Sequence, residues 1–291
     1  MNYQTLSVTI CSFAVSGQQI RALFLLLLLG LTGCRGTGTG TFTNDRPVRF
    51  HSQGDGYVIQ SDAPLGDDSP LIKELNQLRR EITATLQLPP QRDPVTIYLF
   101  ENEDSYRRYM RTTWPNLPPR RAYFVGTRRE LAIYSYRGQN VQTDLRHEFT
   151  HGLLHGSLET VPLWLDEGLA EYFEVRPVTG GPHKDHIQHL QNARADGWGP
   201  SLAHLEELTD FRNMTQRDYA ESWGWVHYML NQDGNARSDL IAYLQELRSS
   251  RIAPPFQPRL EQSTPNSYNS MISHVSRMAN GIALTGFERG R

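Results

Sequence analysis

The chain has 291 residues, of which 38% are hydrophobic and 21% are charged, and its formal net charge is −2. This is enough material for one substantial hydrophobic core or two small ones. Because Lys and Arg do not outnumber Asp and Glu, the composition argues against a nucleic-acid partner held by a general positive field.

The first 33 residues resemble a secretory signal peptide. Arg21 precedes a hydrophobic run of about ten residues, which is too short to span a bilayer of about 30 Å. The run leads into Leu31-Thr32-Gly33-Cys34, which resembles the bacterial lipobox. This resemblance implies a protein that is exported and attached to the lipid bilayer of the bacterial cell membrane through an acylated Cys34. The alternative is an ordinary secretory signal with a cysteine nearby by chance.

Residues 34–46 are predicted to be a flexible tether, because Gly and Thr alternate after Cys34. The chain has one other cysteine, Cys11. Cleavage would remove Cys11 and lipidation would consume Cys34, so no disulfide is expected in the mature domain. An exported fold without disulfides depends on its core and on any metal that it binds.

The hydrophobic pattern from residue 47 onward predicts an α+β fold, with strands in the first part and helices in the second. The hydrophobic alternation and the Gly54-Asp55-Gly56 turn indicate a hairpin at the start. We expect strands at 49–51, 57–60, 95–100, 123–125 and 131–136, and helices at 71–86 and 103–111.

The most specific motif is His147-Glu148-Phe149-Thr150-His151. Two imidazoles one helical turn apart can bind a zinc ion, and the carboxylate between them can act as a general base. The structural alternative is a pair of helix histidines that face solvent or accept hydrogen bonds in the core.

The motif is predicted to lie on a helix from about Val141 to Leu154, capped by Asn140 and ended by Gly156. One face of this helix carries the motif histidines and Glu148, and the opposite face is apolar, so the ligands should point into a cleft. His155 lies about 12 Å along the axis from His147, too far to bind the same ion. We interpret it as a residue behind the ligands or at the surface.

A catalytic zinc site needs a third protein ligand, and the segment Pro162–Phe173 can supply it. This segment predicts a helix with Glu167 and Glu171 on one face, four residues apart. Taken alone, the two glutamates would be read as part of an ordinary solvent-exposed helix face. Because the histidine motif lies just upstream, we favour a ligand role for them.

The two segments HEFTH and WLDEGLAEYF together resemble the gluzincin metallopeptidases, in particular the peptidase MA-like group. The resemblance covers mainly residues 140–175 and implies one zinc ion bound by His147, His151 and Glu167, with Glu148 as the base. It also implies that Glu171 orients His147. A metzincin pattern is excluded because it needs Gly at Leu154 and His at Ser157. The implied fold is a small zincin-like domain over residues 47–250, with a mixed sheet, a mainly helical half and the active-site cleft between them.

Peptide hydrolysis also needs a donor for the oxyanion of the tetrahedral intermediate. Such enzymes use a tyrosine or histidine on a later helix, and Tyr219 is our candidate on a helix predicted from about Gln216 to Asn231. The structural alternative is a core tyrosine whose hydroxyl bonds a neighbouring carbonyl. Two further helices are predicted at 202–208 and 238–249.

Two other segments are less informative. His183, His186 and His189 recur every three residues, and we favour a solvated helix over a second metal site because no carboxylate or cysteine completes an evident set. Residues 251–291 are expected to be a Pro-, Ser- and Gln-rich tail with one short helix near residues 268–278 at most.

The sequence therefore predicts a zinc-dependent, membrane-anchored peptidase that acts as a monomer on a peptide or protein substrate. One alternative is a non-catalytic interaction protein of the cell envelope that keeps a zinc-stabilised gluzincin scaffold. A further alternative is hydrolysis of a nonpeptide amide. The presence of Glu148 favours catalysis, because a structural zinc needs no base beside it.

Overall fold

The computed structural model describes residues 46–66, 68–175, 181–232 and 234–288. The expected signal peptide, the lipidated Cys34 and the tether up to residue 45 lie outside the described residues. Within the part of the chain that is described, no helix has the length and apolar character needed to cross a membrane.

The first part of the chain forms a five-stranded mixed sheet in the order β1-β2-β3-β5-β4. Strands β1 (Phe50–Gly54) and β2 (Tyr57–Ser61) form the hairpin that the sequence predicts. Helix α1 (Pro70–Leu86) connects β2 to β3 (Val95–Phe100), which lies parallel to β2. Helix α2 (Glu103–Thr113) follows, and then β4 (Ala122–Gly126) and β5 (Leu131–Tyr136) form an antiparallel pair, with β5 parallel to β3.

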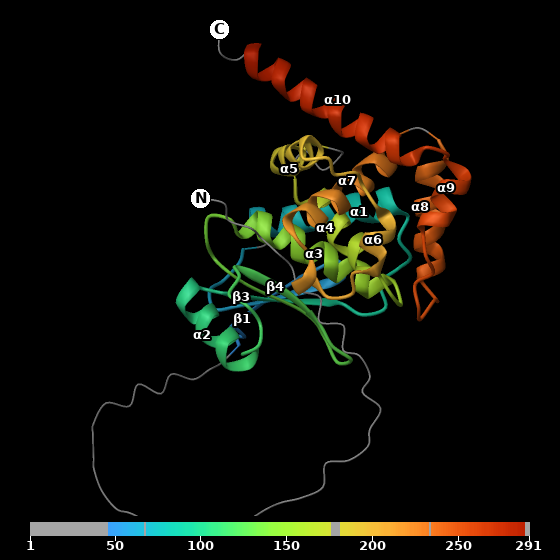
Figure 1. The fold of residues 1–291 in the computed structure, drawn as a ribbon. Helices are drawn as coiled ribbons and strands as arrows, with labels where there is room; N and C mark the ends of the chain where they lie inside the picture. Colours follow the sequence, from blue (N-terminus) through green and yellow to red (C-terminus); the bar gives the residue numbers. More distant parts are fainter. Residues whose placement is uncertain (1–45, 67, 176–180, 233, 289–291) are drawn as a thin grey trace, which may run out of the picture.

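Side chains alternate between the two faces of this sheet, as the period of a strand requires. On one face Ile97, Phe124 and Ile133 join the main core under α1 and α3 (Val141–Ser157). On the other face an aromatic cluster that includes Tyr98 and Tyr134 packs against α2. Figure 1 shows α2 on one side of the sheet and α1 and α3 on the other. Since α3 also contacts β4 and β5, the sheet fixes the position of the motif helix.

The second part of the chain is helical and forms a further layer over α3. Helix α4 (Leu163–Glu174) packs on α3 and on α7 (Gln216–Asn231), and α5 (Lys184–Ala195) packs on α7. The short helix α6 (Leu202–Glu207) and a 3-10 turn (Phe211–Asn213) lead into α7, and α8 (Asn235–Leu247) follows it. The mixed α+β fold with a helical second half is confirmed.

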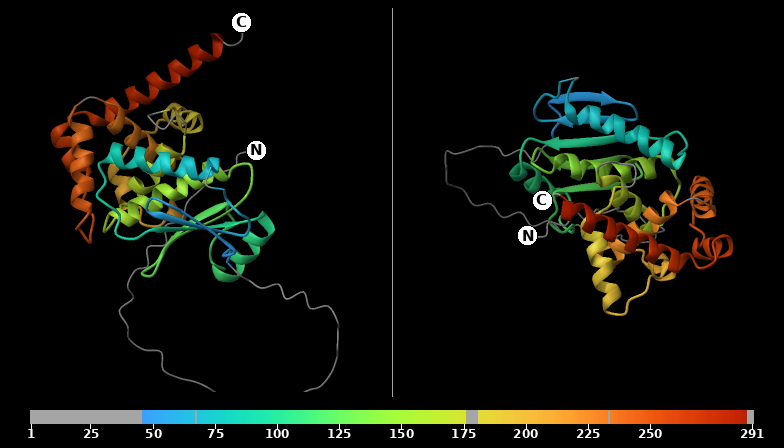
Figure 2. Two further views of the ribbon diagram at one scale, coloured as in Figure 1. Left: turned by 180° about the vertical axis from the view of Figure 1, so that it is seen from behind. Right: turned by 90° about the horizontal axis from the view of Figure 1, so that it is seen from above.

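The C-terminal segment differs from the tail that the sequence predicts. Residues 257–263 form α9 (Gln257–Ser263), and α10 (Ser267–Glu288) is a helix of 22 residues. Leu260, Met271 and Val275 are buried in the main core, and α10 runs across α5 and α7 (Figure 2). The composition is polar, but apolar residues recur at helical spacing and provide one buried face.

The ends of α3 also differ from the prediction. Asn140 is the N-cap residue, but its side chain makes no capping hydrogen bond. Gly156 does not end the helix, which continues to Ser157. A Cβ at Gly156 would lie 3.3 Å from the carbonyl oxygen of Asp93, so this glycine allows a close approach to the start of β3.

Candidate metal centre

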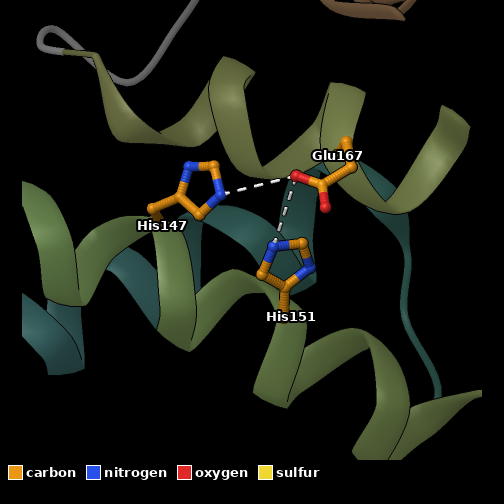
Figure 3. Close-up of side chains that lie close together, drawn as sticks. All are labelled: His147, His151 and Glu167. Carbon is orange, nitrogen blue, oxygen red and sulfur yellow. Dashed lines mark ion pairs between the residues drawn. The ribbon is translucent and has the colours of Figure 1, made fainter. Parts of the chain in front are cut away.

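The two motif histidines lie one turn apart on α3, and Glu167 of α4 faces both of them. Its Oε2 lies 3.7 Å from His147 Nε2 and 3.8 Å from His151 Nε2. Figure 3 shows the two imidazoles and the carboxylate pointing toward one common position. The structure thus brings together the three residues that the sequence predicts as ligands.

Two local features hold α3 and α4 in this arrangement. The connection between them is short, and the backbone N–H of Leu158 closes the end of α3 on the carbonyl of Leu154. Gly168 of α4 faces α7, and a Cβ there would lie 2.6 Å from the carbonyl oxygen of Ser222. Only glycine permits this approach, so the glycine next to Glu167 lets α4 lie between α3 and α7.

The ligand atoms are buried and have no hydrogen-bond partner among the described residues. His147, His151 and Glu167 have exposed fractions of 0%. His147 Nε2, His151 Nε2 and both Glu167 carboxylate oxygens are without a partner. Leaving buried polar atoms unpaired costs about 1–3 kcal/mol each, so native proteins rarely do so without an ion or water to bind.

This donor set fits a divalent metal ion. Two imidazole nitrogens and one carboxylate oxygen are the ligands of many catalytic zinc sites. Burial lowers the pKa of His147 to about 3, so the imidazole is neutral and its nitrogen can donate a lone pair. Burial, followed by the charges of Asp166 and Glu171, raises the pKa of Glu167 well above its usual value; a cation at the ligand atoms would reverse that shift.

The Nδ1 atoms of both histidines lie against carboxylates of α4. Asp166 Oδ1 is 2.8 Å from His151 Nδ1, and its Oδ2 is 3.0 Å from His155 Nε2. Burial raises the pKa of Asp166, the imidazoles of His151 and His155 lower it, and the net shift is downward. His155 therefore lies behind the ligands, as the sequence predicts.

Glu174 lies nearer to the ring of His147 than the predicted Glu171 does, and one atom of each of these three residues lies within 4.8 Å of the others. Glu174, not Glu171, lies 2.8 Å from His147 Nδ1 through its Oε2. Glu171 contacts His186 instead, with 3.0 Å between Oε2 and Nε2. Both glutamates lie on one side of α4, and the crossing of α4 over α3 brings the later one to His147. A helical wheel of α4 alone cannot show this crossing.

Glu148 lies beside the ligands and is also fully buried. Its Oε2 accepts a 2.7 Å hydrogen bond from the backbone N–H of Phe124 in the edge strand β4, and its Oε1 has no partner among the described residues. Burial raises the pKa of Glu148 to about 8 against the opposing effects of the Phe124 N–H and Arg120. The sequence predicts ligands that point into a cleft, and the structure places these residues and Glu148 beneath the surface, at the junction of the two halves.

Tyr219 lies in the first turn of α7, and its hydroxyl is buried. Burial and then the charge of Glu167 raise the pKa of Tyr219, whereas Arg120 lowers it. The raised pKa keeps the hydroxyl protonated near neutral pH.

Sequence reasoning missed three residues of the site: Asp166, Glu174 and Arg120. Asp166 and Glu174 could have been found as additional acidic residues on the helix of the third ligand. Arg120 lies in the loop before β4, with its guanidinium 5.1 Å from the Phe211 ring centroid, and its charge lowers the pKa values of Glu148 and Glu167. No sequence pattern marks it.

One comparison with known proteins matches a segment of the chain that contains this site. A family model described as "Protein of unknown function (DUF1570)" matches residues 141–256. The matched segment begins at the start of α3 and includes the three ligands, Glu148 and Tyr219. A search of the curated proteins finds no match to the chain.

Proposed function

We propose that the chain is a zinc-dependent peptidase in which His147, His151 and Glu167 bind the ion and Glu148 is the general base. The supporting observation is the set of buried ligand atoms without partners, in two neighbouring helices, beside a second buried carboxylate. When bound, a zinc ion supplies a Lewis acid that polarises a carbonyl and lowers the pKa of a water molecule to about 7.

A single hydrogen bond, accepted by one carboxylate oxygen, holds Glu148 in one orientation. Phe124 N–H fixes Oε2, and Oε1 is left free to accept the proton of the attacking water and to return it to the leaving nitrogen. Burial raises the pKa of this carboxyl, and a nearby cation lowers it again. These opposing effects suit a group that must both accept and donate a proton near neutral pH.

We assign Tyr219 and β4 to the binding of the substrate. A protonated phenol can donate a hydrogen bond to the oxyanion that forms on the substrate carbonyl. Strand β4 lies at an edge of the sheet, next to α3. An extended peptide can pair with such an edge through its main chain, so we assign a peptide or protein as the substrate.

The test compares the full-length protein with its Glu148→Gln variant on a mixed peptide library, with zinc content measured in both. We expect the variant to retain zinc and to lose hydrolysis. Glu159→Gln is the matched control, because Glu159 pairs with Arg92 on the surface. Equal cleavage by the wild type and Glu148→Gln would contradict the assigned base. Cell-wall fragments assayed beside the library separate peptide from nonpeptide amide hydrolysis.

The second candidate function is a non-catalytic interaction protein that binds zinc for stability. The complete burial of the ligands favours it, because a structural ion needs no access for a substrate. Glu148 opposes it, because the carboxylate has no structural task beyond one hydrogen bond. Absence of cleavage by both proteins, with zinc bound, would favour this candidate.

We further propose that the protein is attached to the bacterial membrane through Cys34. The support is the Leu31–Cys34 segment after a hydrophobic run, and two acyl chains on one cysteine would make the attachment stable. Metabolic labelling with a palmitate analogue should label the wild type and not Cys34→Ser. Equal labelling of both would contradict the anchor.

A further inference from the structure

A second cluster of metal-binding residue types lies beside the first. Glu171 of α4, one turn after Glu167, faces His183 and His186, which are the N-cap and a first-turn residue of α5. The start of α5 therefore lies with these imidazoles against the carboxylate of Glu171. The sequence alone does not show which carboxylate completes a set with this histidine triplet, and the fold brings Glu171 to it.

The geometry of this cluster suits a single ion. Glu171 Oε2 lies 3.0 Å from His186 Nε2 and 3.6 Å from His183 Nε2. One ligand atom from each of the three residues lies within 4.8 Å of the others. Zinc–ligand distances of about 2.0–2.1 Å in tetrahedral geometry place neighbouring ligand atoms roughly 3.3 Å apart, which falls between the two observed distances.

The surroundings hold the ligands while leaving a route for an ion. The side chains of Glu171, His186 and His183 are 6%, 11% and 17% exposed. The two imidazoles stack with 3.8 Å between ring centroids, and the Trp223 ring packs against both. His189, the third histidine of the triplet, faces elsewhere and contacts the carbonyl of Asp185.

We propose that Glu171, His183 and His186 bind a second divalent transition-metal ion, next to the ligand set of His147, His151 and Glu167. Imidazole with carboxylate favours zinc and its neighbours over Mg²⁺ or Ca²⁺. Three protein ligands leave one position for water on the partly exposed side. The ion would tie the start of α5 to α4. This inference does not depend on hydrolysis at the first site.

Binding replaces the contact between His186 Nε2 and Glu171 Oε2 with bonds to the ion, and it has one further local cost. Coordination through His183 Nε2 requires its proton to be on Nδ1, which now accepts a 3.3 Å contact from the backbone N–H of His186. Losing that contact frees one backbone donor at the start of α5, where water can replace the ring nitrogen. The net contribution of such a hydrogen bond is about 1 kcal/mol, which is small beside the binding energy of a zinc ion.

The experiment measures zinc bound per chain in the full-length protein, after chelator treatment, titration with Zn²⁺ and removal of excess. We expect two ions in the wild type and one in His183→Gln, His186→Gln and Glu171→Gln. His189→Gln, a histidine on the same helix that contacts neither Glu171 nor the other two rings, is the control and should bind two.

A second measurement separates the two sites. His147→Ala with His151→Ala should leave one ion bound, and adding His186→Gln should remove it. Co²⁺ absorption bands should follow the same pattern, and circular dichroism confirms that each variant is folded. If His186→Gln does not fold, the zinc content of the His147/His151 double variant tests the second site by itself. No loss of an ion in the three single variants, or no ion left in the His147/His151 double variant, would overturn the proposal.

Discussion

At the scale of single residues, each motif histidine has a carboxylate at its Nδ1 atom, and both carboxylates come from the helix that carries the third ligand. Asp166 serves His151 and Glu174 serves His147. Such a contact fixes the ring orientation and places the proton on Nδ1, so that Nε2 is free to bind metal. One helix, α4, therefore supplies both a candidate ligand and the groups that contact the other two candidate ligands.

Removal of either orienting charge should weaken metal binding. We expect Asp166→Asn and Glu174→Gln each to lower zinc affinity at the His147 site by about 10–100-fold, because the imidazole loses the partner that fixes its tautomer. Competition with a chromophoric chelator measures this affinity. The His186→Gln background keeps the measurement confined to the first site. Unchanged affinity in both variants would refute the orienting role.

The hydroxyl of Tyr219 should matter for turnover and not for metal binding. Tyr219→Phe is expected to lower kcat by about 10²–10³-fold, because it removes the proposed oxyanion donor. Zinc content should stay the same. Tyr228→Phe removes a hydroxyl from the same helix, on a buried ring that packs against Trp225 and His274, and should leave kcat unchanged. Similar kcat values for both variants would exclude Tyr219 as the donor.

At the scale of elements, the contact between α4 and α7 determines where Glu167 lies. Gly168 is the point of closest approach, with Ser222 and Val226 of α7 against it. The motif helix α3 is enclosed between the sheet and α4, so even its polar face is buried. A helix with a polar stripe is usually expected to expose it. Here the stripe faces the carboxylates of α4.

A methyl group at Gly168 should be destabilising although alanine favours helix. We expect Gly168→Ala to lower the free energy of unfolding by about 1–3 kcal/mol through overpacking, because backbone atoms of Ser222 cannot move aside easily. Gly224→Ala is the matched control on α7, since its Cβ would meet the flexible Leu190 side chain at 3.2 Å. Urea denaturation measures both. Equal effects in the two variants would contradict a special role for Gly168.

At the scale of the whole molecule, one main core extends from Tyr57 in β2 to Ala279 in α10. The sheet and the helical half share it, and the ligand set lies at their junction. The last two helices belong to this core, so the C-terminal segment is part of the folded body. Buried, like-charged carboxylates at the junction oppose folding unless a cation compensates them.

Metal removal should therefore lower the stability of the entire fold. An ion that binds only the native state adds about 2.7 kcal/mol when its free concentration is 100-fold above Kd, which corresponds to about 5–10 °C in Tm for a chain of this size. We expect chelator-treated protein to unfold at a lower temperature and two equivalents of Zn²⁺ to restore its Tm. Mg²⁺ is the control and should not. Identical Tm values with and without chelator would contradict the role of the ion.

Local pattern was enough to predict most elements, the two histidines of the candidate site and the pair Glu167 and Glu171 from which its third residue comes. Period-two and helical patterns gave β3 over residues 95–100 and α7 over residues 216–231 with the bounds that the structure has. The spacing of His147 and His151 placed them one turn apart, because helical geometry is set by residues close in sequence. The short connection to α4 then made Glu167 a near neighbour.

Tertiary structure decided everything that depends on how the helices cross. It placed Glu174 against the Nδ1 atom of His147. It also turned Glu171 toward His183 and His186, and it brought Arg120 near Glu148 and Glu167. It also folded the C-terminal segment onto α5 and α7. These outcomes depend on packing between segments far apart in the chain, and a single sequence carries periodicity within each helix but no crossing angle between two of them.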